Sequence, residues 1–292
     1  MAINVYQIVT DRIIAELEKG HIPWKQPWNN VRSGAFNRIT KRSYSLLNQM
    51  LLSHKGEYAS YKQWQNIGGC VRRGEKSEIV VFWKLFQKKE TDYITGKEKT
   101  KIFPMLRYYN VFHISQVDGV KPLPSDIVLN EIDPVEDAER LFTHYIQEEG
   151  IRFEQELNNE AFYSPLRDAI HMPLKEQFKN QAEYYSTLFH ETVHSTGHTA
   201  RLSRFESGLQ KAHFGSESYS KEELVAELGS ADILHRLGIE TTESFLNNAA
   251  YIQNWLQVLK NDCRFVVQAA SKAEKAVNYI LGETGNMEDD HE

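Results

Sequence analysis

The stretch His190-Glu191-Thr192-Val193-His194 decides how the second half of this chain folds, because it is an HExxH motif. On a helix the two histidines lie on one face and can both point a ring nitrogen at one zinc ion (Zn2+). Apolar residues at near-helical spacing lead into the motif: Phe178, Ala182, Tyr185, Phe189 and Val193. The pattern predicts a helix that carries His190 and His194 as metal ligands and Glu191 as a general base. The alternative is a helix with two surface histidines.

A catalytic zinc site needs a third protein ligand. A histidine three residues after Gly197 would complete one known pattern, but Ala200 stands there. His198 comes two residues too early to replace it, although it could line the site. The helix that follows offers Glu223 and Glu227, one turn apart. We predict Glu223 as the third ligand, and Glu227 as the partner that orients a ligand histidine or as the substitute ligand.

Glu223 also has a purely structural interpretation. Ser220 and Glu223 form a Ser-x-x-Glu capping box, in which Glu223 would only cap the start of its helix. If Glu223 is a ligand, zinc would lower the pKa of a bound water and Glu191 would take its proton. The predicted chemistry is then hydrolysis of a carbonyl compound.

The charge is distributed unevenly along the 292 residues. The whole chain has a formal net charge of −6, yet residues 1–121 carry 20 Lys and Arg against 10 Asp and Glu. Gly119, Pro122 and Pro124 mark the change to the acidic half. We therefore expect two domains with different partners. The expected segments are a basic domain at 1–121, a linker at 122–135, a second domain at 136–286 and an acidic tail at 287–292.

The basic half reads as α+β. Helices are expected at 5–19 and 46–52 and from Ser60 onward, and strands are expected at 79–83 and 103–112. Basic residues alternate with aromatic ones, a mixture that holds single-stranded nucleic acid by stacking and phosphate contacts. The predicted DNA contacts are Trp24, Lys25, Trp28, Arg38, Lys41, Arg42, Tyr44, Trp64, Arg72, Arg73 and Lys76, and Tyr61, Tyr108 and Tyr109 share this setting. The alternative is that the tryptophans anchor the core.

Two cysteines, Cys70 and Cys263, exclude a cysteine-based zinc site and fit a reducing cytoplasm. No apolar run approaches the length of a membrane span, so no membrane partner is expected. The first twenty residues predict an amphipathic helix rather than a signal peptide.

Both halves together resemble the ArdC-type antirestriction family of plasmids, phages and conjugative elements. The stretches that carry the resemblance are residues 5–14, Pro23-Trp24-Lys25-Gln26-Pro27-Trp28, residues 68–76, Val81-Phe82-Trp83-Lys84, residues 190–198 and residues 222–228, together with Tyr163, Asp168, Ile170 and Pro173. The resemblance implies an N-terminal domain that binds single-stranded DNA and a zincin-like metallopeptidase domain with a small sheet over the HExxH helix. It also implies that an edge strand of this sheet binds substrate, with residues 168–173 as that edge.

Two functions follow from the resemblance. The first is an antirestriction protein of a mobile element, such as a phage or plasmid, that binds single-stranded DNA and cleaves a host protein at a zinc site. The alternative is a non-catalytic protein that shields DNA and in which the zinc site only supports the fold. A nuclease is disfavoured, because neither paired metal-binding carboxylates nor a phosphate-cradling glycine loop occurs.

Overall fold

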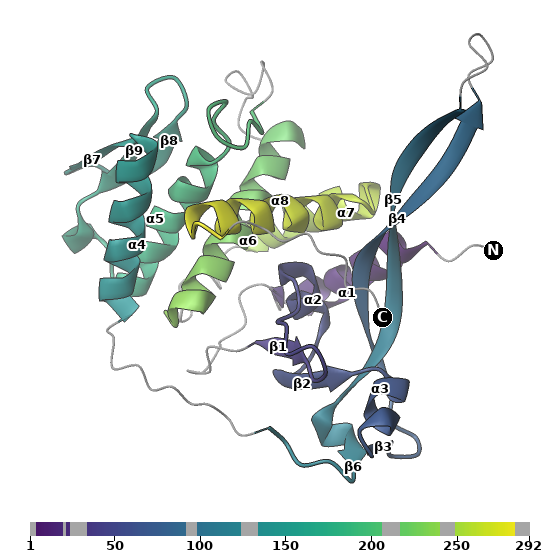
Figure 1. Cartoon of the computed structure of the whole chain (residues 1–292). Coiled ribbons are helices and arrows are strands. Elements are labelled where there is room, and N and C mark those ends of the chain that lie inside the picture. Colours follow the sequence, from purple (N-terminus) through teal and green to yellow (C-terminus); the bar gives the residue numbers. More distant parts are fainter. Residues whose placement is uncertain are drawn as a thin grey trace.

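The structure is a computed structural model, and of the 292 residues it describes 4–19, 22–23, 34–91, 98–123, 134–205, 217–239 and 249–283. Trp24, Lys25 and Trp28 lie outside these described residues, as do the expected acidic tail and most of the expected linker. Helices alternate with small sheets along the chain, so the predicted α+β fold class is confirmed (Figure 1).

The N-terminal half contains a four-stranded sheet with the strand order β1-β2-β5-β4. The strands are β1 (Ala35–Asn37), β2 (Gly56–Ala59), β4 (Glu78–Thr91) and β5 (Glu98–His113). In a second, two-stranded sheet, β3 (Cys70–Val71) pairs with β6 (Val117–Asp118). A short 3-10 helix, η2 (Ile114–Gln116), precedes β6 in the chain. The helices are α1 (Val5–Glu18), α2 (Leu46–Leu51) and α3 (Tyr61–Asn66). Ser60 and Gln63 form a capping box, so α3 begins where the sequence predicts.

Strands β4 and β5 are longer than the sequence predicts. They pair antiparallel from Glu78 opposite Val111 to Thr91 opposite Glu98. Their inner parts belong to the sheet, and their outer parts project from the body at the right of Figure 1. We call residues 84–87 and 102–105 of these outer parts the arm.

The C-terminal half packs helices against a three-stranded sheet with the order β7-β9-β8. Its strands are β7 (Arg152–Glu156), β8 (Phe162–Ser164) and β9 (Ala169–Pro173). Its helices are α4 (Pro134–Glu149), the short η3 (Lys175–Gln177), α5 (Gln181–Ser195), α6 (Glu217–Leu237), α7 (Ala249–Asn261) and α8 (Phe265–Ile280). None of the helices that the structure describes combines the length and apolarity needed to cross a membrane.

Strand β9 is the central strand of this sheet, so the expectation that residues 168–173 form a free edge is wrong. Ile170 pairs with Phe153 of β7 in parallel and with Tyr163 of β8 antiparallel. The backbone donors and acceptors of this strand are therefore shared with two neighbours. Among the described strands, β7 and β8 form the edges.

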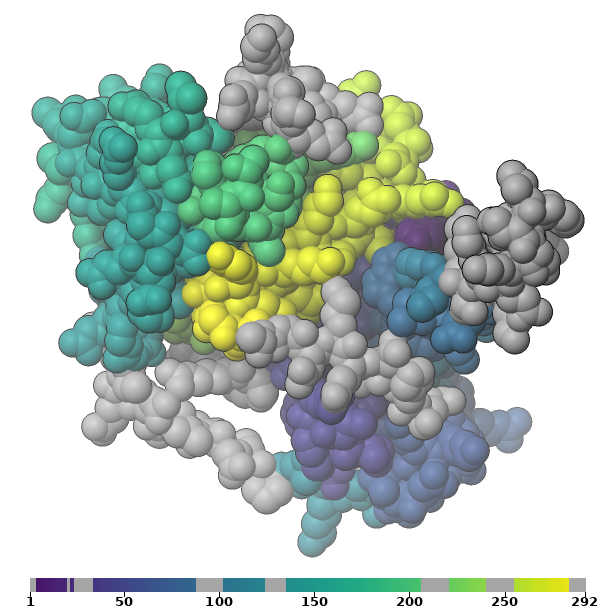
Figure 2. Space-filling model, turned by 45° about the horizontal axis from the view of Figure 1, so that its top comes forward, coloured from purple at the N-terminus to yellow at the C-terminus, as the bar shows by residue number. Residues whose placement is uncertain are grey.

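One hydrophobic core runs through both halves. Ile13 of α1 and Leu51 of α2 belong to the same buried cluster as Leu188 of α5 and Val277 of α8. Helix α8 contacts α6 as well as α1 and α2, and its yellow surface lies between the two halves in Figure 2. The segment boundaries expected at 121 and 136 stay predictions, and the shared core makes it unfavourable to separate the halves.

Candidate functional site

Helix α5 begins and ends at defined contacts, which fixes the HExxH residues in space. The side chain of Asn180 caps the start by accepting a hydrogen bond from the backbone N–H of Glu183 at 2.9 Å. At the other end, Arg201 Nε donates to the carbonyl of Ser195 at 2.8 Å. Leu188 is fully buried on the core side. The predicted helix is therefore confirmed, and the opposite face of its second half is free to carry the site.

Helix α6 approaches α5 closely because a glycine lies at the crossing. A Cβ atom on Gly229 would lie only 2.8 Å from Cγ2 of Val193. Leu224 and Leu228 of α6 are fully buried at this contact. The close approach carries Glu223, further towards the start of α6, to the histidines of α5.

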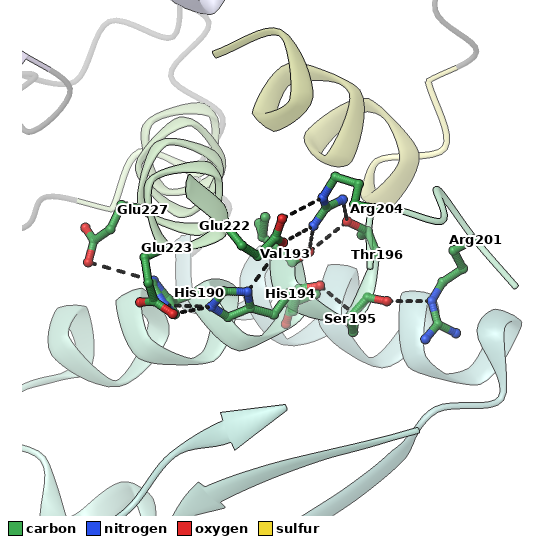
Figure 3. A network of polar contacts seen from close by, with 11 residues as sticks. His190, Val193, His194, Ser195, Thr196, Arg201, Arg204, Glu222, Glu223 and Glu227 are labelled. Atoms are coloured by element: carbon green, nitrogen blue, oxygen red, sulfur yellow. Dashed lines mark hydrogen bonds and ion pairs between the residues drawn. The ribbon is translucent and has the colours of Figure 1, made fainter. Parts of the chain in front are cut away.

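Three predicted ligands converge at this crossing (Figure 3). The Nε2 atoms of His190 and His194 lie 3.1 Å apart. The two carboxylate oxygens of Glu223 lie 3.5 Å from His190 Nε2 and 3.4 Å from His194 Nε2. All three donor atoms fall within 4.8 Å of one another, and this is a suitable spacing for one metal ion. Glu223 does not act as the alternative N-terminal cap, because α6 begins at Glu217, before Ser220.

Each histidine has a carboxylate beside its other ring nitrogen. Glu227 Oε1 lies 3.8 Å from Nδ1 of His190, the place that the sequence predicts for a residue that orients a ligand. Glu222 Oε1 lies 3.5 Å from Nδ1 of His194, and the sequence reading missed this residue. Carboxylates in these positions fix ring orientation and make a histidine a better ligand.

Glu222 is itself held by a buried arginine. Arg204 Nη2 donates to Glu222 Oε1 at 2.7 Å, and Arg204 Nε donates to Oε2 at 3.2 Å. Arg204 also donates to Thr196 Oγ1 at 2.6 Å and to the carbonyl of Val193 at 2.8 Å. The guanidinium therefore connects the end of α5 to the first turns of α6. Its two hydrogen bonds to Glu222 orient the carboxylate of that residue. No signal in the sequence marks Arg204, because its partners lie on two separate helices.

The electrostatics of the cluster favour a cation. Burial disfavours the charged form of His194, but its contacts with Glu222 and Glu223 outweigh burial and raise its pKa to about 10. Burial likewise opposes the charge of Glu223, yet His190 and His194 hold the pKa of this carboxyl well below its usual range. Protons on the rings thus balance the carboxylates when no metal is bound. Two imidazoles and one carboxylate are a donor set that zinc and related divalent ions prefer, so these residues fit a metal ion.

Glu191 and His198 occupy different places. Glu191 is buried, with 8% of its surface exposed, and its negative charge acts on both His190 and His194. His198 lies past the end of α5, where its Nδ1 accepts a hydrogen bond from the N–H of Ala200 at 3.2 Å. Among the described residues, the group that could hold a metal does not include His198.

Two of the predicted DNA contacts are corrected by the structure. Trp64 is completely buried, and its indole Nε1 donates to the carbonyl of Phe112 at 2.9 Å. Tyr44 is 92% buried and packs its ring edge against Tyr58. Neither ring is exposed enough to stack on a base, and the alternative that the tryptophans anchor the core fits Trp64.

Two of the predicted basic contacts form ion pairs with carboxylates of this chain. Arg38 forms an ion pair with the buried Glu57, and Arg72 pairs with Glu75 at 2.8 Å and with Asp118 at 3.3 Å. The other described cations among the predicted contacts are exposed and lie in or just after two turns: Lys41, Arg42, Arg73 and Lys76.

A groove of about 430 Å³ lies over the inner parts of β4 and β5. Its lining includes the predicted Arg42 and Tyr44, and several residues that were not predicted. Cations and aromatic rings alternate along it, among them Phe82, Lys84, Arg107 and Tyr109. The alternation of these residue types within the two strand sequences was a usable signal, since residues two apart share one face of a strand.

Comparison with known protein families defines the class of each half. Residues 137–272 match the model of a zincin-like metallopeptidase, and residues 3–112 match the N-terminal domain of the anti-restriction factor ArdC. The second half is thus a zincin-like domain, and the predicted family resemblance is confirmed.

Solved structures and relatives that match almost the whole chain show to which family it belongs. The metal-free crystal structure of the antirestriction protein ArdC from plasmid R388 is 33% identical, covers 96% of this chain and 98% of that one, and superposes with a TM-score of 0.73. The Mn(II)-bound structure of that protein gives 32% identity and a TM-score of 0.74, covering 98% of this chain and 100% of that one. The chain belongs to the ArdC antirestriction family.

Other relatives share the same region within different contexts. The protein y4eC of Sinorhizobium fredii is 34% identical over 95% of this chain and 91% of its own length. The DNA primase TraC of Escherichia coli is 34% identical over 94% of this chain, yet the chain spans only 27% of TraC. The family therefore also occurs as one part of a longer protein.

Proposed function

We propose that this protein is an antirestriction protein of a mobile element, binding single-stranded DNA and cleaving a host protein in the cytoplasm at a divalent-metal site. The convergence of His190, His194 and Glu223, with Glu191 beside them, is the observation that carries the peptidase part. A zincin-like domain supplies the framework in which these residues act.

The metal chemistry follows from the residues that would hold the ion. His190, His194 and Glu223 would bind it, and zinc would supply Lewis acidity and lower the pKa of a bound water. Glu191 would accept the proton of the attacking water and pass it to the leaving amine. Glu222 and Glu227 lie 3.5 and 3.8 Å from the Nδ1 atoms of His194 and His190 and would help to orient the two rings when a metal is bound. We propose zinc for this chain, while the related ArdC protein has been crystallised with Mn(II).

Single-stranded DNA binding rests on the groove over β4 and β5. Lys84 and Arg107 are exposed there, next to Phe82 and Tyr109. Cations that neutralise phosphates, interleaved with rings that stack on bases, bind single strands with little sequence preference. The surplus of Lys and Arg in residues 1–121 draws a polyanion to this half.

The peptidase proposal is tested with Glu191→Gln in the full chain. This variant should keep its metal and its DNA binding, since Glu191 is not one of the three ligands. It should fail to protect unmodified DNA that enters a restricting host. Glu183→Gln, on the first turn of the same helix, is the matched control and should protect normally.

A second candidate function is protection of DNA by binding alone. It is favoured by the way the site ties α5 to α6 through Arg204, which would suit a metal that stabilises the fold. In that case Glu191→Gln would protect as well as the unchanged protein, and the peptidase proposal would be wrong. The full chain is needed for this test, because the two halves share one core.

A further inference from the structure

The arm exposes a concentration of apolar side chains. Leu85, Phe86, Ile102, Phe103 and Met105 are between 36% and 55% exposed. Five large apolar residues are thus exposed within two paired strand segments, and exposed apolar surface of this kind marks contact surfaces. The arm contributes little to the core, so its apolar character requires another explanation.

The strand register separates the arm residues into two faces. Residues directly opposite in an antiparallel pair point to the same side, and sides alternate along each strand. Phe86 lies opposite Phe103, and Lys84 lies opposite Met105, on one face. Leu85 lies opposite Pro104 on the other face. We call these the phenylalanine face and the leucine face.

The phenylalanine face continues the wall of the groove. Phe82 lies opposite Arg107, two residues further in on the same side as Lys84 and Phe86. Both Phe82 and Arg107 line the groove, and the ring of Phe82 meets that of Tyr109 edge to face at 5.7 Å. Successive pairs on this face are about 7 Å apart along the strands. A row of rings and cations therefore leads from the groove onto the arm.

The leucine face reaches the groove at its inner end, where Trp83 and Tyr108 of this side line it, but its further surroundings differ. Val81 and Leu106 lie on this side and are buried in the core that includes α1. Trp83, on the same side, contacts Tyr6 of α1 edge to face at 6.2 Å. This side anchors the base of the arm to the body. Further out, Leu85 and Ile102 carry no charge that would attract a nucleic acid.

Charge decides what the phenylalanine face binds. Lys84 Nζ lies 5.9 Å from the centre of the Phe86 ring, so a positive charge sits directly beside an exposed aromatic surface. Arg107 adds a second exposed cation at the inner end. Aromatic faces next to cations suit a ligand that combines flat bases with phosphates.

We infer that single-stranded DNA runs out of the groove along the phenylalanine face of the arm, where Phe86 and Phe103 stack on bases and Lys84 contacts a phosphate. This inference rests on the proposed single-strand binding and extends it to a second contact region. It makes the arm the element that sets how many nucleotides the protein covers.

The test compares two double variants, each of which removes two exposed apolar side chains from one face of the arm. Phe86→Ala with Phe103→Ala strips the phenylalanine face, and Leu85→Ala with Ile102→Ala strips the leucine face. All four side chains are exposed, so both variants should fold. Fluorescence anisotropy measures binding of full-length protein to oligothymidylates of about 6 and about 16 nucleotides, which bracket common site sizes.

The phenylalanine-face variant should bind the longer oligothymidylate at least about fivefold more weakly, the loss expected for one stacked base. Its affinity for the shorter one should be unchanged, and the leucine-face variant should resemble the unchanged protein with both. Equal losses in the two variants, or no loss in either, would overturn the inference while leaving the groove proposal intact. If the unchanged protein bound neither oligothymidylate, the proposed DNA binding itself would fail. The unchanged protein and the leucine-face variant could be dimers while the phenylalanine-face variant is a monomer with unchanged DNA binding. That result would identify the phenylalanine face as an interface between copies and would also overturn the inference.

Discussion

Glu222→Gln is the substitution that tests most sharply how the metal ligands are held. Glutamine has the same shape, but it removes the negative charge that lies 3.5 Å from His194 Nδ1. Loss of a carboxylate that orients a ligand histidine weakens metal binding about 10- to 100-fold. This factor corresponds to about 1.4–2.8 kcal/mol of binding free energy.

The same change acts on stability through Arg204, whose side chain is only 6% exposed. Its hydrogen bonds to Thr196 and Val193 remain, but its counter-charge is lost. Removing one partner of a buried ion pair costs about 3–5 kcal/mol, and the retained amide oxygen of glutamine favours the lower end. The free energy of unfolding in chelator should therefore fall by about 3 kcal/mol.

Competition with a chromophoric chelator measures the affinity, and urea unfolding in chelator measures the stability. Glu227→Gln is the matched control, because Glu227 lies further from its histidine, at 3.8 Å, and is not tied to Arg204. The control should weaken metal binding less and should not remove the counter-charge of Arg204. An unaltered metal affinity in Glu222→Gln would refute the reasoning that this carboxylate orients His194.

Three further predictions concern the helix crossing, the groove and pH. Gly229→Ala should lower the free energy of unfolding by about 1–3 kcal/mol in urea, because the new methyl group would press on Val193; unchanged unfolding would mean that the helices can separate freely. Arg107→Ala should weaken single-stranded DNA binding and reduce the slope of log affinity against log salt by about 0.7, whereas Arg152→Ala on the other half should do neither. Equal slopes for the two arginine variants would remove Arg107 from the groove proposal. In metal-free protein the pKa of His194 is raised from 6.5 to about 10, so its stabilising effect is complete below pH 6.5 and is lost as the pH rises towards 10. Between pH 6.5 and 10, the melting temperature of the unchanged protein in chelator should fall more than that of His194→Ala. If the two proteins gave parallel curves of melting temperature against pH, the charge assigned to His194 would be contradicted.

The metal ligands could be predicted from sequence because their spacing is local. HExxH fixes two donors on one helical face, and Glu223 follows from the acidic pattern of the next helix. The same local pattern could not show that Glu222, rather than another glutamate of this helix, lies beside His194. Its role depends on Arg204, eighteen residues earlier, and on the angle at which α5 and α6 cross.

Predictions for the basic half failed where tertiary packing decides exposure. Trp64 follows a clear capping box, yet nothing local shows that its ring turns inward to the carbonyl of Phe112. The arm was missed for the opposite reason. Both of its faces are exposed, so residues 84–87 and 102–105 show no alternation of buried and exposed positions of the kind that reveals a strand. The central position of β9 likewise depends on the pairing of β7 and β8, and no pattern within residues 168–173 encodes it.

The central claim is that His190, His194 and Glu223 hold one catalytic divalent ion, and the metal content of the purified full-length protein tests it most directly. Elemental analysis without added metal should find about one zinc ion per chain, and His194→Ala should lose it while remaining folded. Folded protein that carries no divalent ion, and takes up none when zinc is supplied, would contradict the account.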